Sequence, residues 1–536
     1  MRNIDWNRDW KFWRDKDSFA LVWDIPENAR NIDLPHDAMM EDPASPESRN
    51  GNNTGYRDAE CYTYVKVFEA DKAWKDTRVT VRFDGVYNNA LVYLNGQLTA
   101  KNPFGYTAFY AELTDYLRFD GPNELRVLVR PGAMTNSRWY SGAGIYRDVF
   151  LNILPKTHIE PMGVCADTVR IEDGYAVIQV KTEFNNMDIS PVNARTKVVI
   201  YDRDGNGVAQ RSEPVFISGG GSRELKMQLV IPDALLWDED DPNLYRAVVS
   251  LHSDGTVIDE DDISFGVRTV SADAKGGLRI NGRETLLKGA CIHHDSGILG
   301  AVTYYEAEYR RVKRLKEAGF NAVRMAHHPA SGALLKACDE LGMYVMDELS
   351  DMWDRPKSNY DFALDFDEWW PVILSQMVRN DRTHPCVIMY SIGNEIPEIG
   401  TPKGADRASE LARSIKETDD TRLVTAGING VFAAGDDIPK IVADVAKGLS
   451  SDGDNGGNVN DFMTLMDGHL DEIVTHRAIS KRLEWASSSL DVAGYNYMTA
   501  RFEPDGEEYP DRVIVASETY PPEIARNWEL TKRLSH

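Results

Sequence analysis

The arrangement of apolar residues changes near Leu278, and this change constrains the fold more than any other feature of the sequence. Before it, apolar and polar residues alternate in short segments such as 62–68, 78–83 and 125–130, a period that is typical of half-buried β-strands. After it, short apolar runs alternate with segments of helical period, which is typical of parallel βα units. The chain is therefore predicted to carry β-domains first and an α/β domain last.

Two β-domains are predicted before residue 271. Residues 1–154 contain short strands separated by turn signals such as Asn95-Gly96, a pattern typical of a two-sheet sandwich. Residues 155–270 contain roughly seven further strand-like segments, which fits an immunoglobulin-like β-sandwich. No motif that carries chemistry stands out there, so this region is interpreted as a spacer. At about 150 residues per domain, a chain of 536 residues has room for a third domain.

Residues 271–536 are predicted to form a (β/α)8 TIM barrel that lacks its last strand. Seven strand-like runs precede helical segments, at 286–292, 322–325, 343–346, 387–391, 423–426, 492–495 and 513–516. Because the chain ends at His536, two strand edges would be left unpaired, an exposure that proteins normally avoid. We therefore expect a fragment of a longer protein, or a gap filled by another segment or subunit, and poor activity of this chain alone. The Gly/Asp/Asn-rich tract 451–458 is interpreted as a long loop near the barrel mouth or a solvated linker.

The charge balance and the cysteines limit the partners and the location. Acidic residues number 85 and basic residues 60, so the net charge is −25, and no Lys/Arg run supplies the basic footprint that nucleic acid or an anionic membrane needs. No apolar run approaches the ~18 residues of a membrane span, and the N-terminus lacks the apolar region of a signal peptide. The five cysteines have no Cys-x-x-Cys spacing, which predicts buried free thiols and a cytoplasmic location. No cofactor is predicted, and a homo-oligomer is left open.

Polar and ionisable side chains follow six of the seven predicted barrel strands. The working residues of such a barrel lie where strands end and βα loops begin. Packing does not explain the set, because buried charges cost free energy unless they are paired. The set comprises His293, His294 and Asp295 after the first strand, Arg324, His327 and His328 after the second, Asp347 and Glu348 after the third, Asn394 and Glu395 after the fourth, Asn496 and Tyr497 after the sixth, and Glu518 after the seventh.

Glu395 and Glu518 stand out because each directly follows an apolar strand. Glycoside hydrolysis needs such a pair, since one carboxylic acid protonates the leaving oxygen and one carboxylate attacks the anomeric carbon, about 5 Å apart in a retaining enzyme. The alternatives are a structural ion pair for Glu395 and a chance match for Glu518, whose context Ser-Glu-Thr-Tyr is short. Asp347 and Glu348 are either partners that support the residues in contact with the substrate or a pair that caps a helix.

Three segments resemble the signatures of glycoside hydrolase family 2, which includes β-galactosidases, β-glucuronidases and β-mannosidases. Residues 381–395, Asp-Arg-Thr-His-Pro-Cys-Val-Ile-Met-Tyr-Ser-Ile-Gly-Asn-Glu, resemble the acid/base signature. Residues 321–329 with 342–348 resemble the second signature, and residues 136–148 resemble the loop that leaves the first domain. The resemblance implies a jelly-roll sugar-binding domain, an immunoglobulin-like domain and a TIM barrel, in that order.

The resemblance also implies a role for each candidate residue. Glu395 would be the general acid/base and Glu518 the nucleophile of a retaining, exo-acting β-glycosidase. Asn394 would bond the sugar 2-hydroxyl, while Tyr497 donates to Glu518 and Arg324 keeps it ionised. No metal site is implied, because residues 349–353 read Leu-Ser-Asp-Met-Trp, where the family's magnesium-dependent galactosidases carry a carboxylate together with a histidine. The remaining predicted contacts to an oligosaccharide or β-glycoside are His293, His327, Asn496, Asp347, Glu348 and the expected aromatic wall Trp353.

The sugar and the class of protein leave alternatives open. The strand-end histidines favour a β-galactosidase, and the alternative is a β-glucuronidase, whose Asn-x-Lys motif would lie beyond this chain. Two His-His pairs suggest a metal-dependent amidohydrolase, but His293 and His294 are adjacent and would point to opposite faces of an extended strand. A non-catalytic carbohydrate-binding protein is the third interpretation, prompted by the incomplete barrel.

Overall fold

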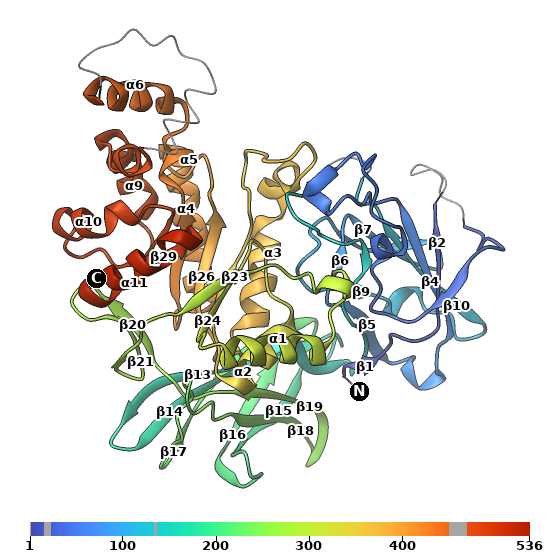
Figure 1. Ribbon diagram of the computed structural model, residues 1–536. Coiled ribbons are helices and arrows are strands. Elements are labelled where there is room, and N and C mark those ends of the chain that lie inside the picture. Colours follow the sequence, from blue (N-terminus) through green and yellow to red (C-terminus); the bar gives the residue numbers. More distant parts are fainter. Residues whose placement is uncertain (1, 16–22, 133–136, 450–468) are drawn as a thin grey trace.

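Two β-sandwiches and a βα barrel make up the computed structural model, which describes residues 2–15, 23–132, 137–449 and 469–536 (Figure 1). Asn136 and the tract 451–458 lie outside the described residues. None of the helices in the described part combines the length and apolar character that a membrane crossing needs.

The first sandwich consists of two antiparallel sheets around a shared apolar core. One sheet has the strand order β1-β12-β5-β9 and the other the order β3-β2-β4-β10-β7-β8. Strand β7 buries every second residue, as the period of its sequence predicts. The strands are β1 (Ile4–Asp5), β2 (Trp10–Arg14), β3 (Arg30–Ile32), β4 (Tyr62–Glu69), β5 (Thr77–Phe83), β7 (Ala90–Leu94), β8 (Gln97–Asn102), β9 (Phe109–Glu112), β10 (Pro122–Val129) and β12 (Val149–Pro155), with a short pair β6 (Val86–Tyr87) and β11 (Gly144–Ile145).

The second sandwich has the immunoglobulin-like arrangement that the sequence predicts, with strand orders β13-β14-β17 and β16-β15-β18-β19. Its strands are β13 (Thr157–Glu172), β14 (Tyr175–Asn186), β15 (Val192–Tyr201), β16 (Gly207–Ile217), β17 (Gly221–Ile231), β18 (Tyr245–Ser253) and β19 (Thr256–Phe265). A small sheet of β20 (Val270–Asp273), β21 (Gly277–Ile280) and β22 (Arg283–Glu284) precedes the barrel.

Seven parallel strands form the barrel, in chain order from β23 to β29. They are β23 (Gly289–Ile292), β24 (Ala322–Met325), β25 (Tyr344–Glu348), β26 (Val387–Asn394), β27 (Leu423–Ile428), β28 (Ala493–Asn496) and β29 (Ile514–Glu518). Strands β24, β25, β26 and β28 are buried at every residue, because side chains fill the barrel and helices cover it. The helices are α1 (Tyr305–Glu317), α2 (Gly332–Leu341), α3 (Phe366–Asp381), α4 (Pro402–Thr418), α5 (Gly430–Ala434), α6 (Ile438–Leu449), α8 (Leu470–Val474), α9 (Arg477–Ser487), α10 (Phe502–Glu508) and α11 (Ile524–Arg533).

The barrel has one open seam, between β23 and β29, and the predicted absence of an eighth strand is confirmed for the described residues. The two strands stand at opposite ends of the strand order and share no backbone ladder among those residues. Both are only partly buried. The prediction that all five cysteines are buried is wrong, because Cys291 lies on the uncovered strand β23 and is exposed, and Cys61 is half-buried. At the foot of β29, the Ile514 amide donates to the carbonyl of His536 (2.8 Å).

A loop of the first sandwich reaches the mouth of the barrel. Arg138 in this loop forms an ion pair with Asp351, which follows β25. Farther along the loop, the carbonyl of Ser141 accepts from His294 Nε2 (2.9 Å). In Figure 1 the first sandwich accordingly lies beside the barrel. The first domain therefore takes part in building the region where the barrel strands end.

Candidate active site

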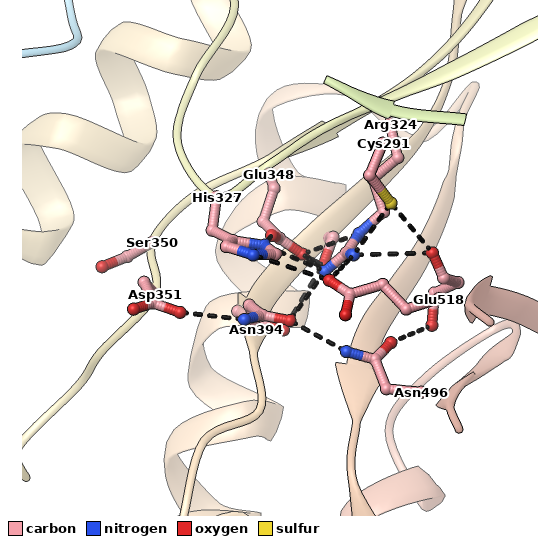
Figure 2. Close-up of polar contacts among 12 residues, drawn as sticks. Cys291, Arg324, His327, Glu348, Ser350, Asp351, Asn394, Asn496 and Glu518 are labelled. Atoms are coloured by element: carbon pink, nitrogen blue, oxygen red, sulfur yellow. Dashed lines mark hydrogen bonds and ion pairs between the residues drawn. The ribbon is translucent and has the colours of Figure 1, made fainter. Parts of the chain in front are cut away.

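Arg324 is the buried centre of a hydrogen-bond network at the carboxyl ends of the barrel strands (Figure 2). Its guanidinium donates to Glu348 Oε2 (2.6 Å), Glu518 Oε1 (2.7 Å) and Asn394 Oδ1 (2.9 Å). Glu348 also accepts from His327 Nδ1 (2.8 Å). Burial alone would raise the pKa of Glu348, but Arg324 and His327 outweigh it, and this pKa is lowered. The network thus holds an ionised, fully buried carboxylate behind the strand ends.

Glu518, at the end of β29, is held by two donors. Arg324 donates to one carboxylate oxygen and the Tyr497 hydroxyl donates to the other, Oε2 (2.5 Å). Burial raises the pKa of Tyr497, and the hydrogen bond to Glu518 and the negative charges of Glu518 and Glu395 raise it further. Both candidate catalytic carboxylates therefore lie near the same phenol.

Glu395 directly follows β26 and has a different environment from Glu518. Its backbone is left-handed (φ 45°), which is uncommon for a residue with a Cβ, and its amide donates to the carbonyl of Gly427 (2.6 Å). Its Oε1 accepts from Asn429 Nδ2 (2.9 Å), a neutral donor. Among the described residues, no ion pair to the Glu395 carboxylate is formed. One carboxylate is therefore paired with a cation and the other with an amide.

Asn394 and Asn496 complete the network from the fourth and sixth barrel strands. Asn394 Oδ1 accepts from Arg324 and from Asn496 Nδ2 (3.0 Å), and Asn394 Nδ2 donates to Asp351 Oδ1 (2.8 Å). Ser517 Oγ donates to Asn496 Oδ1 (2.7 Å). Both amides are buried, so their orientation is determined by these partners.

The structure adds residues that sequence reasoning missed. Asp351, whose side chain is fully buried, accepts from Arg138 Nε and Nη2 (both 2.8 Å) and from Lys357 Nζ (2.8 Å). Burial raises the pKa of Asp351, but Arg138 and Lys357 outweigh it, so this pKa is lowered. Arg138 lies in segment 136–148 and Asp351 in segment 349–353, and both segments were considered in the sequence analysis for their resemblance to the family. The signal was present, but nothing in the sequence pairs the two segments.

The four histidines divide into two pairs. His293 lies against the Trp139 ring (centroids 5.1 Å apart), and its Nδ1 is buried with no partner among the described residues. His294 Nδ1 and His328 Nε2 are 3.1 Å apart in the buried joint with the first domain. His293 and His294 follow β23, which ends at Ile292, and their rings have different neighbours, Trp139 and His327 for His293, and Tyr106, Tyr146 and His328 for His294. In the described part of the chain, no group of three or more His, Cys, Asp or Glu side chains could hold a metal ion.

In the described part of the chain, Asp347 and Trp353 form no side-chain hydrogen bond to Arg324, Glu518 or Asn394. Asp347 is fully buried, and its Oδ1 accepts from the amides of Ala330 (2.9 Å) and Glu348 (3.1 Å). Trp353 is also fully buried, and its Nε1 donates to the carbonyl of Ile392 (3.0 Å). A ring without an exposed face offers nothing to a sugar, so the structure does not support the predicted aromatic wall at Trp353. The partly exposed Trp139 is the aromatic side chain beside His293 instead.

Two sandwiches followed by a βα barrel, with two glutamates at the strand ends and a buried arginine bonded to one of them, are the features of a multidomain glycoside hydrolase. Comparison with known families identifies the family. Residues 40–155 match the model described as "Glycosyl hydrolases family 2, sugar binding domain", residues 157–268 match "Glycosyl hydrolases family 2", and residues 273–461 match "Glycosyl hydrolases family 2, TIM barrel domain". The chain belongs to glycoside hydrolase family 2.

Similar proteins are longer than this chain. Beta-galactosidase BoGH2A of Bacteroides ovatus is 33% identical over 517 residues, which are 96% of this chain and 59% of that protein. A putative beta-glucuronidase of Formosa agariphila is 31% identical over 425 residues, 79% of this chain and 40% of that protein. The crystal structure of a glycosyl hydrolase family 2 member from Bacteroides cellulosilyticus has a TM-score of 0.88 and 34% identity, and the match covers 100% of this chain and 64% of that one.

Proposed function

We propose that the chain carries the catalytic site of a retaining, exo-acting β-glycosidase that removes terminal β-linked galactose. The observation that carries this proposal is that the two carboxylates have different hydrogen-bond donors. Glu518 accepts from a cation and a phenol, and Glu395 accepts from a neutral amide. Donors of this kind stabilise negative charge on Glu518, as a nucleophile requires, while Glu395 is free of an ion pair in the described structure, as a proton donor requires.

The proposed reaction has two steps. Glu518 attacks the anomeric carbon and forms a covalent glycosyl–enzyme, while Glu395 gives its proton to the leaving oxygen. Glu395, now a carboxylate, takes a proton from water as the water attacks the same carbon and releases the sugar and Glu518. Asn394 bonds the 2-hydroxyl, and His293 and His327 bond other hydroxyls of the sugar.

The test is a pair of substitutions assayed with aryl β-glycosides. Glu518→Ala is expected to abolish turnover and leave sugar binding in place, and added azide is expected to restore activity by replacing the lost nucleophile. Glu395→Gln is expected to slow hydrolysis most for leaving groups that need protonation. Unchanged product formation by Glu395→Gln would remove Glu395 from the mechanism, and no product from the parent chain would favour a binding protein.

A β-glucuronidase is the second candidate, favoured by the similarity to the Formosa agariphila protein. Beta-galactosidase BoGH2A supports galactose, because its match covers more of this chain at higher identity. Nitrophenyl β-galactoside and nitrophenyl β-glucuronide, compared by kcat/KM under the same conditions, separate the two. A higher kcat/KM for the glucuronide would overturn the galactoside proposal while leaving the family and the mechanism intact.

A further inference from the structure

An arginine of the first domain covers a carboxylate of the barrel. Arg138 Nε and Nη2 donate to Asp351 Oδ2 and Oδ1, both at 2.8 Å, so the guanidinium and the carboxylate meet as two parallel hydrogen bonds. The side chain of Arg138 is 36% exposed, whereas that of Asp351 is fully buried. Arg138 therefore shields Asp351 from solvent, although the two residues belong to different domains.

Asp351 in turn fixes the orientation of the Asn394 amide. Asn394 Nδ2 donates to Asp351 Oδ1 (2.8 Å), and Asn394 Oδ1 accepts from Arg324 (2.9 Å) and Asn496 (3.0 Å). A flipped amide would set its oxygen against the Asp351 carboxylate and its NH2 against the Arg324 guanidinium. Neither contact could form a hydrogen bond, so Asp351 and Arg324 together select the orientation of the Asn394 amide, whose second N–H has no partner among the contacts described.

Lys357 does not replace Arg138 in this role. Its ammonium donates to the same oxygen, Asp351 Oδ1, and also to the backbone carbonyl of Asn394 (both 2.8 Å). Asp351 Oδ2 is bonded by Arg138 Nε alone among the contacts described. A planar guanidinium holds both oxygens of a carboxylate in one plane, and an ammonium does not. Removal of Arg138 would therefore leave Asp351 able to rotate.

We propose that Arg138 is a positioning residue of the reaction: acting through Asp351, it holds the Asn394 amide in the orientation that donates to the sugar 2-hydroxyl. The inference rests on the proposed function, since it assumes a glycoside in the site. The contact to the 2-hydroxyl strengthens in the transition state of glycoside hydrolysis, so the effect of Arg138 appears in kcat more than in KM.

The experiment compares Arg138→Gln with the parent on two substrates, the aryl β-glycoside that the parent hydrolyses best and the same glycoside without its 2-hydroxyl. The matched control is Arg379→Gln, because Arg379 of α3 donates in the same two-pronged way to Glu183 of the second sandwich (2.8 and 3.0 Å), away from the network. The second variant is Arg138→Lys, which keeps the positive charge but cannot form the two parallel hydrogen bonds. Thermal midpoints of all variants report on folding.

Arg138→Gln is expected to lower kcat/KM at least about tenfold for the 2-hydroxy substrate and less than about twofold for the 2-deoxy substrate, with Arg138→Lys in between. Arg379→Gln is expected to leave the ratio of the two substrates unchanged. Equal losses on both substrates, or no loss, would overturn the role of Arg138 while leaving the proposed function in place. A parent that hydrolyses no β-glycoside would overturn the proposed function and this inference with it.

Discussion

Arg324 shows how one side chain can organise a site that is assembled from several strands. Its planar guanidinium carries five N–H donors and stays charged, so it can serve Glu348, Glu518 and Asn394 at once. Burying such a charge is costly unless a countercharge is also buried, and Glu348, which is fully buried, supplies it. Glu348 neutralises the charge of Arg324. The ion pair between Arg324 and Glu518 can therefore orient the Glu518 carboxylate without burying that carboxylate fully.

A second pair of buried carboxyl groups lies behind the network and makes stability depend on pH. Asp347 and Asp381 are both buried, and Oδ2 of each has no hydrogen-bond partner among the described residues, so little compensates a negative charge on both groups. Burial and the negative charge of Asp381 raise the pKa of Asp347 well above its usual range. The folded protein therefore retains a proton that the unfolded chain releases above about pH 4, and stability contributed by the pair is lost as pH rises from there.

Asp347→Asn is expected to remove this loss. The amide oxygen can still accept from the Ala330 and Glu348 amides, and the side chain of an asparagine has no carboxyl proton to release as pH rises. Urea unfolding at pH 5 and pH 8 measures the effect: the free energy of unfolding of the variant relative to the parent should increase with pH. A difference that is the same at both pH values would contradict the raised pKa of Asp347.

At the scale of elements, β27 contributes to the site because it has no side chain at Gly427. Gly427 lies on this strand, and a Cβ there would come within 2.6 Å of Arg324 Nη2 and 3.2 Å of Asn394 Oδ1. A side chain at this position would push the guanidinium out of the network. Strand β27 therefore has two roles: it forms part of the barrel wall, and its glycine leaves room for the Arg324 guanidinium.

Gly427→Ala is expected to lower kcat/KM at least about tenfold, because small displacements of catalytic groups cost large factors in rate. Gly207→Ala is the matched control, since Gly207 also lies on a strand and its nearest contact to an added Cβ would be 3.8 Å away. Circular dichroism should show both variants folded. Full activity of Gly427→Ala would mean that Arg324 can shift without consequence.

The strands of the barrel and their order could be predicted from the sequence, because buried parallel strands are short apolar runs and polar residues end or follow most of them. The candidate site could be predicted where a residue ends a strand, as Asn394 and Glu518 do, or directly follows one, as Glu395 does. Arg138 could not be predicted, because 213 residues separate it from Asp351 and no local period encodes that contact. The sequence predicted an aromatic wall at Trp353, but the position of a residue in the loop after β25 does not determine the direction of its side chain.

At the scale of the whole molecule, the open seam and the domain contacts act on the same site. The edge strand β29 carries Glu518 at its end, and its neighbour across the seam, β23, precedes His293. A sheet edge that lacks a backbone ladder opens more readily than a central strand, so we expect the strand that holds the proposed nucleophile to open more readily than its neighbours. The matched relatives are longer than this chain, which spans 59% of the Bacteroides ovatus protein.

We therefore expect the 536-residue chain to turn over an aryl β-glycoside more slowly than a form of the protein in which a further strand pairs with β23 and β29. The two forms should be compared by kcat at equal concentrations of active sites. Hydrogen exchange of the amides of β29 gives an independent readout and should slow when the seam is filled. Equal turnover by the two forms would contradict the expectation.

Covalent trapping tests the central claim most directly. A 2-deoxy-2-fluoro β-galactosyl donor with a good leaving group slows release of the sugar more than its attachment, so a retaining enzyme accumulates the glycosyl–enzyme. Mass spectrometry of the intact chain should show one added sugar, and peptide mapping should place it on Glu518. No covalent sugar in a chain that hydrolyses the matching galactoside, or a sugar attached to any residue other than Glu518, would contradict the claim.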